Sequence, residues 1–265
     1  MKKTLFLSFV LTLATPIKAD ESNHTQICAE QQHQMIAHHF KIAQEQLSAR
    51  ALASACKTAP NNSAETLVSY AVIEPKYSKE NYQDDHENTP KWTLFVARVN
   101  DNAILQSWEQ DMEIDASIDV NADSLKIDTA RYILNDKVRA FGVRFNNAAR
   151  GPSAPEYWAN DYLMLFVPDN EKLKLVFDYP MTFWNILDDK ETKTETSNLV
   201  LQMDNKQTKG FNDIILKADI TQHIWSTGFY DIGRELKSEN YRQEKVRLKY
   251  NGSRYSPVEK AEWLH

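Results

Sequence analysis

Glycine, cysteine and the short motifs of common enzymes are all scarce in this chain. Its 265 residues include six glycines and two cysteines, and they contain no GxSxG, HExxH, GxGxxG or P-loop pattern. So little glycine argues against glycine-rich phosphate loops. Outside the N-terminal segment the histidines are His86, His223 and His265, which leaves little material for a Ser-His-Asp site.

No hydrophobic run after the N-terminus approaches the length of about 18 residues that a membrane-spanning helix needs. The first 19 residues carry Lys2 and Lys3, a short apolar run and a small residue at Ala19, which is the layout of a secretory signal peptide. We therefore expect cleavage after residue 19 and a periplasmic or secreted product with no membrane span. Cleavage removes three lysines and no acids, so the formal net charge moves from −6 to −9. Such an acidic chain is a poor ligand for nucleic acid.

The two cysteines, Cys28 and Cys56, both follow the signal peptide. An isolated pair in an oxidising compartment is typical of one disulfide. Residues 25–55 between them are rich in Ala, Gln and Glu, and their apolar positions recur with the period of an amphipathic helix. One straight helix is too long to join bridged cysteines, so this region either folds back as a helical hairpin or contains a shorter helix. We assign residues 20–60 to this N-terminal helical segment.

Beyond residue 60 the apolar residues no longer recur with the period of a helix. They recur at every second position, which is the period of a strand. Many short strand-like runs follow one another at close spacing, separated by polar turns and without helical patterns between them. This organisation favours an antiparallel β-sandwich or barrel-like domain over residues 61–265. Its central feature is a predicted β-hairpin, in which the runs 125–134 and 139–145 are joined by Asn135, Asp136 and Lys137.

Three arginines in this hairpin, Arg131, Arg139 and Arg144, are the candidate binding residues. Arg139 shares its strand face with three large apolar side chains, so it must reach the rim of the sheet or find a carboxylate. Asp128 and Asp136 are the predicted partners. A structural ion pair that fixes strand register and an anion-binding site are both open interpretations.

Metal sites are not favoured by the spacing of the candidate ligands. His24, His33, His38 and His39 are not separated by the three or four residues that place ligands on one helix face. The alternating acids of residues 113–123 resemble a calcium loop, but Val120 and Lys126 occupy the positions of the required Gly and Glu. We interpret this run as a half-buried strand and expect no metal and no cofactor.

Two polar segments are predicted loops, residues 75–90 and 188–197, because each is almost wholly polar or charged. The aromatic segment 179–184, together with Tyr157 and Trp158, is either a ligand surface or ordinary core and edge packing.

The motifs IDTARY, residues 127–132, and RAFGVR, residues 139–144, resemble a group of uncharacterised exported (periplasmic) bacterial proteins. In that group a Cys-Lys step like Cys56-Lys57 precedes the first strand. The later GFNDIIL and LKYNGSRY, residues 210–216 and 248–255, resemble strand endings of some secreted β-repeat proteins. The resemblance implies an exported β-rich fold and carries over no site.

We therefore expect a non-enzymatic periplasmic protein that binds a protein or an envelope component. One alternative is an envelope hydrolase that uses surface carboxylates around Asp115 and Asp119. Another is an inhibitor of a foreign hydrolase, in which the loop 75–90 plugs the cleft of its partner. A binder should expose a broad apolar or aromatic patch, whereas an enzyme should bring titratable groups together in a deep pocket.

Overall fold

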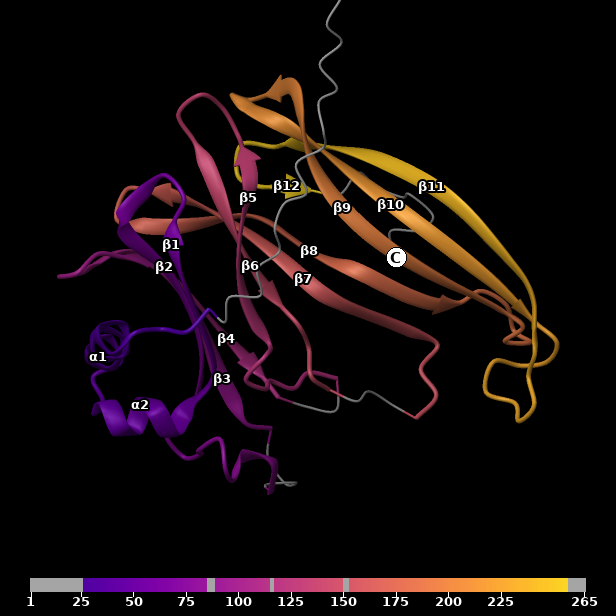
Figure 1. The fold of residues 1–265 in the computed structure, drawn as a ribbon, viewed down its shortest axis with the longest axis horizontal. Helices are drawn as coiled ribbons and strands as arrows, with labels where there is room; N and C mark the ends of the chain where they lie inside the picture. The colour runs from indigo at the N-terminus through magenta and orange to yellow at the C-terminus, as the bar shows by residue number, and fades with distance from the viewer. Residues whose placement is uncertain (1–25, 85–88, 115–116, 150–152, 257–265) are drawn as a thin grey trace, which may run out of the picture.

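The fold was analysed in a computed structural model that describes residues 26–84, 89–114, 117–149 and 153–256 (Figure 1). The chain is mainly β, with a nearly closed, barrel-like sheet and a disulfide near its N-terminus. This confirms the predicted fold class. The predicted signal peptide, residues 1–19, lies outside the described residues.

Two α-helices, one short 3₁₀ helix and twelve strands occupy the described ranges. In chain order they are α1 (Glu30–His39), α2 (Gln44–Arg50), β1 (Ala51–Ala59), β2 (Asn62–Ile73), η1 (Tyr82–Asp84), β3 (Lys91–Val99), β4 (Ile104–Glu113), β5 (Leu125–Ile133), β6 (Arg139–Phe145), β7 (Tyr157–Asp169), β8 (Lys172–Ile186), β9 (Lys193–Thr208), β10 (Phe211–Trp225), β11 (Leu236–Tyr250) and β12 (Tyr255–Ser256).

The sheet is built almost entirely from antiparallel neighbours. Its main path runs β1-β2-β3-β4-β8-β9-β10-β11-β12, and the branch β5-β6-β7 joins it at β8. The step from β4 to β8 is a single parallel bridge between Ser107 and Lys172. Within the described ranges, every other strand pair is antiparallel. Figure 1 shows the long strands β9, β10 and β11 sweeping away from the β1–β4 end of the molecule.

The branch β5-β6-β7 forms a middle layer with apolar side chains on both of its faces. Along β7, Met164 and Phe166 enter the core shared with β1–β4, while Leu163 and Leu165 enter the core shared with β8–β12. Such alternation follows from the period of two in a strand. The predicted hairpin 125–145 supplies two of the three strands of this layer.

Gly142 lets the three strands of this layer approach closely. A Cβ atom at this position would lie 2.9 Å from Cδ1 of Leu163 on β7 and 3.0 Å from Cβ of Asp128 on β5. A larger residue would therefore force these neighbouring side chains apart.

The two helices cover the outer face of β1, β2 and β3, on the opposite side from the middle layer (Figure 1). Ile36 and Leu47 are buried there against Tyr70 and Phe95. The helical segment is shorter than predicted, because α2 ends at Arg50 and residues 51–59 pair with β2 instead. Alanine-rich sequence favours helix locally, but the sheet pairing of these residues overrides that propensity.

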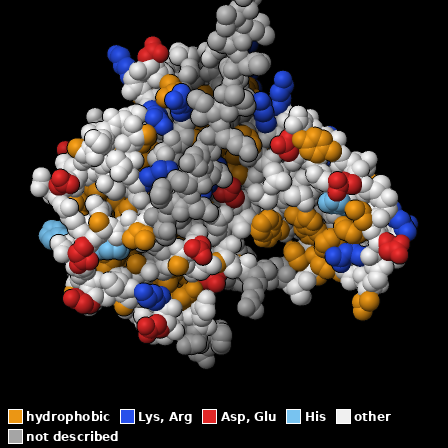
Figure 2. Space-filling model, viewed as in Figure 1, with side chains coloured by type: hydrophobic (Ala, Val, Ile, Leu, Met, Phe, Trp, Pro, Cys, Tyr) orange, Lys and Arg blue, Asp and Glu red, His pale blue; other side chains and the backbone are white. Residues whose placement is uncertain are grey.

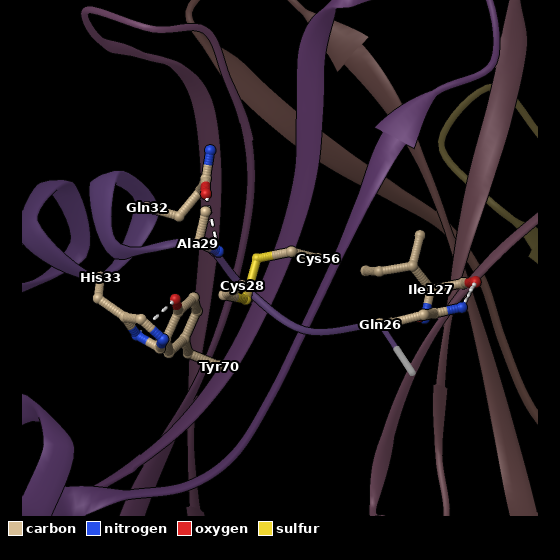
Figure 3. Close-up of a disulfide and its surroundings, with 8 residues drawn as sticks. All are labelled: Gln26, Cys28, Ala29, Gln32, His33, Cys56, Tyr70 and Ile127. Carbon is tan, nitrogen blue, oxygen red and sulfur yellow. Dashed lines mark hydrogen bonds between the residues drawn. A yellow bond between two sulfur atoms is a disulfide. The ribbon is translucent and has the colours of Figure 1, made fainter. Parts of the chain in front are cut away.

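The disulfide joins the residues before α1 to strand β1. Cys28 and Cys56 are bonded, with their Cα atoms 4.8 Å apart. Just before the bridge, the side-chain amide of Gln26 donates to the carbonyl oxygen of Ile127 and accepts from its N–H, at 2.9 and 2.6 Å. Figure 3 shows the side chain of Gln26 at Ile127 of β5, close to the disulfide. Its amide makes the two hydrogen bonds with the backbone of Ile127 that a paired strand would otherwise make. The N-terminal segment is thus tied to two layers of the fold.

Both predicted polar loops contain buried residues. In the described part of 75–90, Tyr77 and Tyr82 are buried in the core, so this segment is anchored and not simply solvated. The prediction of a loop over residues 188–197 is wrong from Lys193 onward, where β9 begins. Glu195 is buried there because Arg242 of β11 donates to it at 2.6 Å.

Removal of the disulfide tests the anchoring of the N-terminal segment. We predict that the double variant Cys28→Ser, Cys56→Ser loses about 3 to 4 kcal/mol of unfolding free energy, because the bridge closes a loop of 28 residues in the unfolded chain. Urea unfolding measures this loss. Wild-type protein with reductant is the control and should match the double variant, while a loss below about 1 kcal/mol would contradict the prediction.

Candidate functional site

The three predicted arginines lie in three different environments. Arg131 is exposed on β5, Arg139 lines a cavity, and Arg144 is largely buried in an ion-pair network within the middle layer. The hairpin therefore supplies three separate features.

Arg144 connects all three strands of the middle layer. Its Nε donates to Asp128 on β5 at 2.9 Å, and its Nη1 donates to Asp161 on β7 at 2.5 Å. The hydroxyl of Tyr132 donates to the same oxygen of Asp128 at 2.8 Å. Every carboxylate of this network is paired with the guanidinium, as buried charges require.

Burial and pairing act in opposite directions on this network. Burial disfavours the charged form of Arg144, but Asp161 and Asp128 outweigh it and raise the pKa of the guanidinium. Burial likewise acts to raise the pKa of Asp128, yet the N–H of Ala130 and the charge of Arg144 hold that pKa below its ordinary value. Burial, and then Asp128, raise the pKa of Tyr132. The network therefore keeps a fixed ion pair, which is the behaviour of a structural element.

The expectation that Arg139 pairs with Asp128 or Asp136 is wrong. Its Nη1 donates to Oδ1 of Asn61 at 2.9 Å, and its Nη2 donates to the carbonyl oxygen of Thr129 at 2.7 Å. Asp128 is taken instead by Arg144, which lies on the opposite face of β6. Among the described residues, no carboxylate lies within 4.0 Å of the Arg139 guanidinium.

Arg139 lines a cavity of about 280 Å³ between the β1–β2 turn, the β5–β6 turn and the end of β7. Its charged lining residues are Glu65, Arg98, Lys137 and Arg139. Its apolar lining includes Leu67, Val138, Phe141 and Pro168. The cavity thus combines charged side chains with an apolar floor.

A second candidate site is a group of rings at the far end of the long strands. Trp184 of β8 lies 5.0 Å from Phe229, and Trp225 of β10 lies 5.6 Å from the same ring, between centroids. Arg234 lies over both Trp225 and Phe229, with its Cζ at 5.2 and 4.3 Å from the ring centroids. We call Trp158, Trp184, Trp225, Phe229 and Ile232 the aromatic surface.

This surface is open to solvent. Ile232 is fully exposed, Trp158 is 37% exposed and sits opposite Trp184 in the β7–β8 ladder, and Trp184, Trp225 and Phe229 are half-buried. Figure 2 shows hydrophobic side chains gathered on the right of the molecule, where Figure 1 places the ends of β8 to β11. Exposed apolar groups of this kind mark interaction sites.

Sequence reasoning found only part of the aromatic surface. The candidates were the segment 179–184 with Tyr157 and Trp158. Of these, Trp158 and Trp184 belong to the surface, whereas Met181 and Phe183 are buried in the core, and Trp225, Phe229 and Ile232 were missed. The signal was present in IWSTGFYDIG, residues 224–233, where four large apolar residues flank glycines of a turn. Their proximity to Trp184 depends on the β8-β9-β10 pairing, which a single sequence does not reveal.

Two of the N-terminal histidines, His33 and His39, link α1 to the sheet. His33 shares a 3.1 Å hydrogen bond with the hydroxyl of Tyr70, and His39 lies 2.7 Å from Glu109. His38 is exposed, and His24 lies outside the described residues. Across the described ranges, no group of three or more His, Cys, Asp or Glu side chains is arranged to hold a metal ion.

The acidic run 113–123 does not form the predicted strand, because β4 ends at Glu113 and residues 117–123 are irregular. Asp119 accepts from the hydroxyl of Tyr82 at 3.1 Å and from Gln83 at 3.3 Å. Burial, and then Asp119, raise the pKa of Tyr82 to about 12. Asp119 therefore anchors the segment around Tyr82, and Asp115 lies outside the described residues.

Comparisons of the chain with family models, with curated proteins and with solved structures found no match. The resemblance carried by residues 127–144 therefore stays a prediction. No helix in the described ranges is both long and apolar enough to cross a membrane.

The ion-pair network yields a test with a defined pH dependence. We predict that Asp128→Asn lowers the unfolding free energy at pH 7 by about 2 kcal/mol, because it removes the charge-assisted hydrogen bond between Nε of Arg144 and Asp128 and leaves Asp161 as the guanidinium's carboxylate partner. The folded pKa of Asp128 is depressed, so its contribution is complete above its unfolded pKa, near 3.9, and is lost as the pH falls through the lower folded pKa.

Urea unfolding of wild type and variant from neutral to acidic pH measures this difference, which should shrink below about pH 4. Asp111→Asn is the matched control, because Asp111 is exposed and an amide oxygen can still accept from Thr93. This control should change stability by less than about 0.5 kcal/mol. Equal losses in the two variants, or a loss for Asp128→Asn that does not change with pH, would refute a structural role for the network.

Proposed function

We propose that this chain is an exported protein, cleaved after Ala19 and located in the periplasm or outside the cell, that acts without catalysis by binding a protein partner. The partner docks on the aromatic surface at the end of β7 to β10. The observation that carries the proposal is the group of half-buried rings Trp184, Trp225 and Phe229, beside which Trp158 and the fully exposed Ile232, three residues after Phe229 in the chain, present apolar side chains to solvent.

The composition of this surface supports a protein partner. Tryptophan, other aromatic residues and arginine dominate the energetic centres of protein interfaces. The surface supplies three tryptophans and places Arg234 across two of its rings. Tilted and edge-to-face ring contacts, together with Arg234, restrain these side chains before a partner arrives, which lowers the entropic cost of binding.

The surroundings of the aromatic surface provide the polar rim that interfaces usually carry. His223 lies 2.9 Å from Glu239, and its ring is 5.7 Å from that of Trp225. Further along the same sheet face, the hydroxyl of Tyr241 donates to Asp219 at 2.7 Å. The pair of His223 and Glu239 therefore borders the apolar centre on the side of β10 and β11, and the Tyr241–Asp219 pair continues the polar face further along these strands.

The sequence of β11 favours a partner that binds to the face of the sheet over one that adds a strand along the edge of β11. Along most of its length, β11 pairs only with β10 among the described strands. Its sequence, LKSENYRQEKVRLKY, places charges along this edge. Charged edge strands, particularly those with lysine, discourage addition of another strand.

Export is supported by two independent features. The disulfide between Cys28 and Cys56 fits an oxidising compartment. The N-terminal sequence has the layout of a signal peptide ending at Ala19. An exported binding protein is consistent with both.

Site-specific photocross-linking in the envelope of the native cell tests the proposal. A photoreactive phenylalanine analogue replaces Leu236, which is 48% exposed and pairs with Trp225. We predict a discrete adduct with one protein, and we predict that adding Ile232→Asp abolishes this adduct. The fully exposed Ile232 contributes apolar contact area without supporting the fold.

Val200→Asp is the matched control, because Val200 is an exposed aliphatic residue on another part of the sheet. It should leave the adduct unchanged, and the same analogue at the exposed Lys57 should give no such adduct. An absent adduct at position 236, the same adduct from position 57, or an adduct that survives Ile232→Asp would each refute the proposed surface.

A further inference from the structure

We infer that the cavity beside Arg139 is a binding site for a small amphiphilic organic anion, a carboxylate with a short aliphatic body. This site is separate from the proposed partner surface and does not depend on it. The cavity lies where the β1–β2 and β5–β6 turns meet, while the aromatic surface lies at the ends of β7 to β10.

The charges around the cavity do not cancel. Its lining carries three cationic side chains, Arg98, Lys137 and Arg139, and one carboxylate, Glu65. Glu65 accepts from Nε and Nη2 of Arg98, at 3.1 and 2.5 Å, so this pair is mutually neutralised. Two positive charges therefore remain at the cavity in a chain whose net charge is −6.

Arg139 is held in place by neutral groups. Asn61 and the carbonyl oxygens of Thr129 and Ala130 accept from its guanidinium. These contacts fix its position but leave its charge uncompensated. Its Nε is buried and has no hydrogen-bond acceptor within the described part of the chain. A positioned but unpaired guanidinium is the arrangement that a carboxylate ligand completes.

Lys137 supplies the second unpaired charge. It is exposed on the β5–β6 turn, and its backbone N–H is fixed by Oδ1 of Asn135 at 2.9 Å. No carboxylate of the described residues lies within 4.0 Å of its ammonium group. Its flexible side chain can therefore close over a bound anion beside Arg139.

The apolar floor selects an anion with a hydrocarbon body over a simple inorganic ion. Leu67 and Phe141 are buried, and Val138 and Pro168 add to the apolar lining. A volume of about 280 Å³ is at the small end of ligand pockets and suits a short aliphatic chain. Transfer of each methylene from water to this floor favours binding.

Amide NMR titration of the full mature protein with octanoate tests this inference at low salt. We expect saturable shifts confined to the amides of residues 59, 61, 62 and 137–141. Arg139→Gln and Lys137→Gln should each weaken octanoate binding by at least about tenfold, because each removes one charge-assisted contact. Lys137 is exposed, so Lys137→Gln tests the site without disturbing the fold.

Arg131→Gln is the matched control. It makes the same charge change on an exposed arginine of the same hairpin that does not line the cavity, and it should leave affinity unchanged. Octanol and inorganic phosphate are the ligand controls, and both should bind at least about tenfold more weakly than octanoate. The inference is overturned by an absence of saturable shifts at these residues, by equal binding of either control ligand, or by equal weakening in Arg131→Gln.

Discussion

The burial of the β5-β6-β7 layer on both of its faces is the constraint on which the rest of the fold depends. Side chains of β7 alternate between the core shared with β1–β4 and the core shared with β8–β12. A one-residue slip in register would exchange every one of these side chains between the two cores. Arg144 opposes such a slip, because it binds Asp128 on one neighbouring strand and Asp161 on the other. Gly142 permits the close approach of the strands that this pairing needs.

Much of this layer could be predicted from the sequence, because the hairpin 125–145 has strong local signals: alternation, β-branched residues and a polar turn. The extent of β9 and β11 could not be predicted. Glu195 is buried in β9 only because Arg242, far along the chain, pairs with it. Composition alone indicates a solvated loop there, since the partner of a buried acid is set by tertiary contacts.

The candidate sites show the same division between local and tertiary signals. A charged residue on an apolar strand face correctly indicates that its side chain needs a polar partner. The sequence could not decide which arginine forms the ion pair with Asp128. In the structure Arg144 takes the carboxylates, and Arg139 is left with neutral acceptors beside a cavity. The aromatic surface joins residues of β7, β8 and β10 that lie together only after the sheet has formed. The hairpin of the middle layer can therefore be predicted from local sequence, whereas both candidate binding regions depend on the order in which strands pair in the sheet.

The middle layer contributes side chains to both cores, so the core on the side of β1–β4 and the core on the side of β8–β12 should not unfold independently. Native-state hydrogen exchange at increasing urea concentration measures this most directly. We expect that amides of β6 and β7 exchange only through global unfolding, and that central amides of β2, β3 and β10 converge on the same free energy. Two results would contradict this expectation. One is exchange of β6 amides at a lower free energy than those of β2 and β10, and the other is unfolding of one core while the other core stays folded.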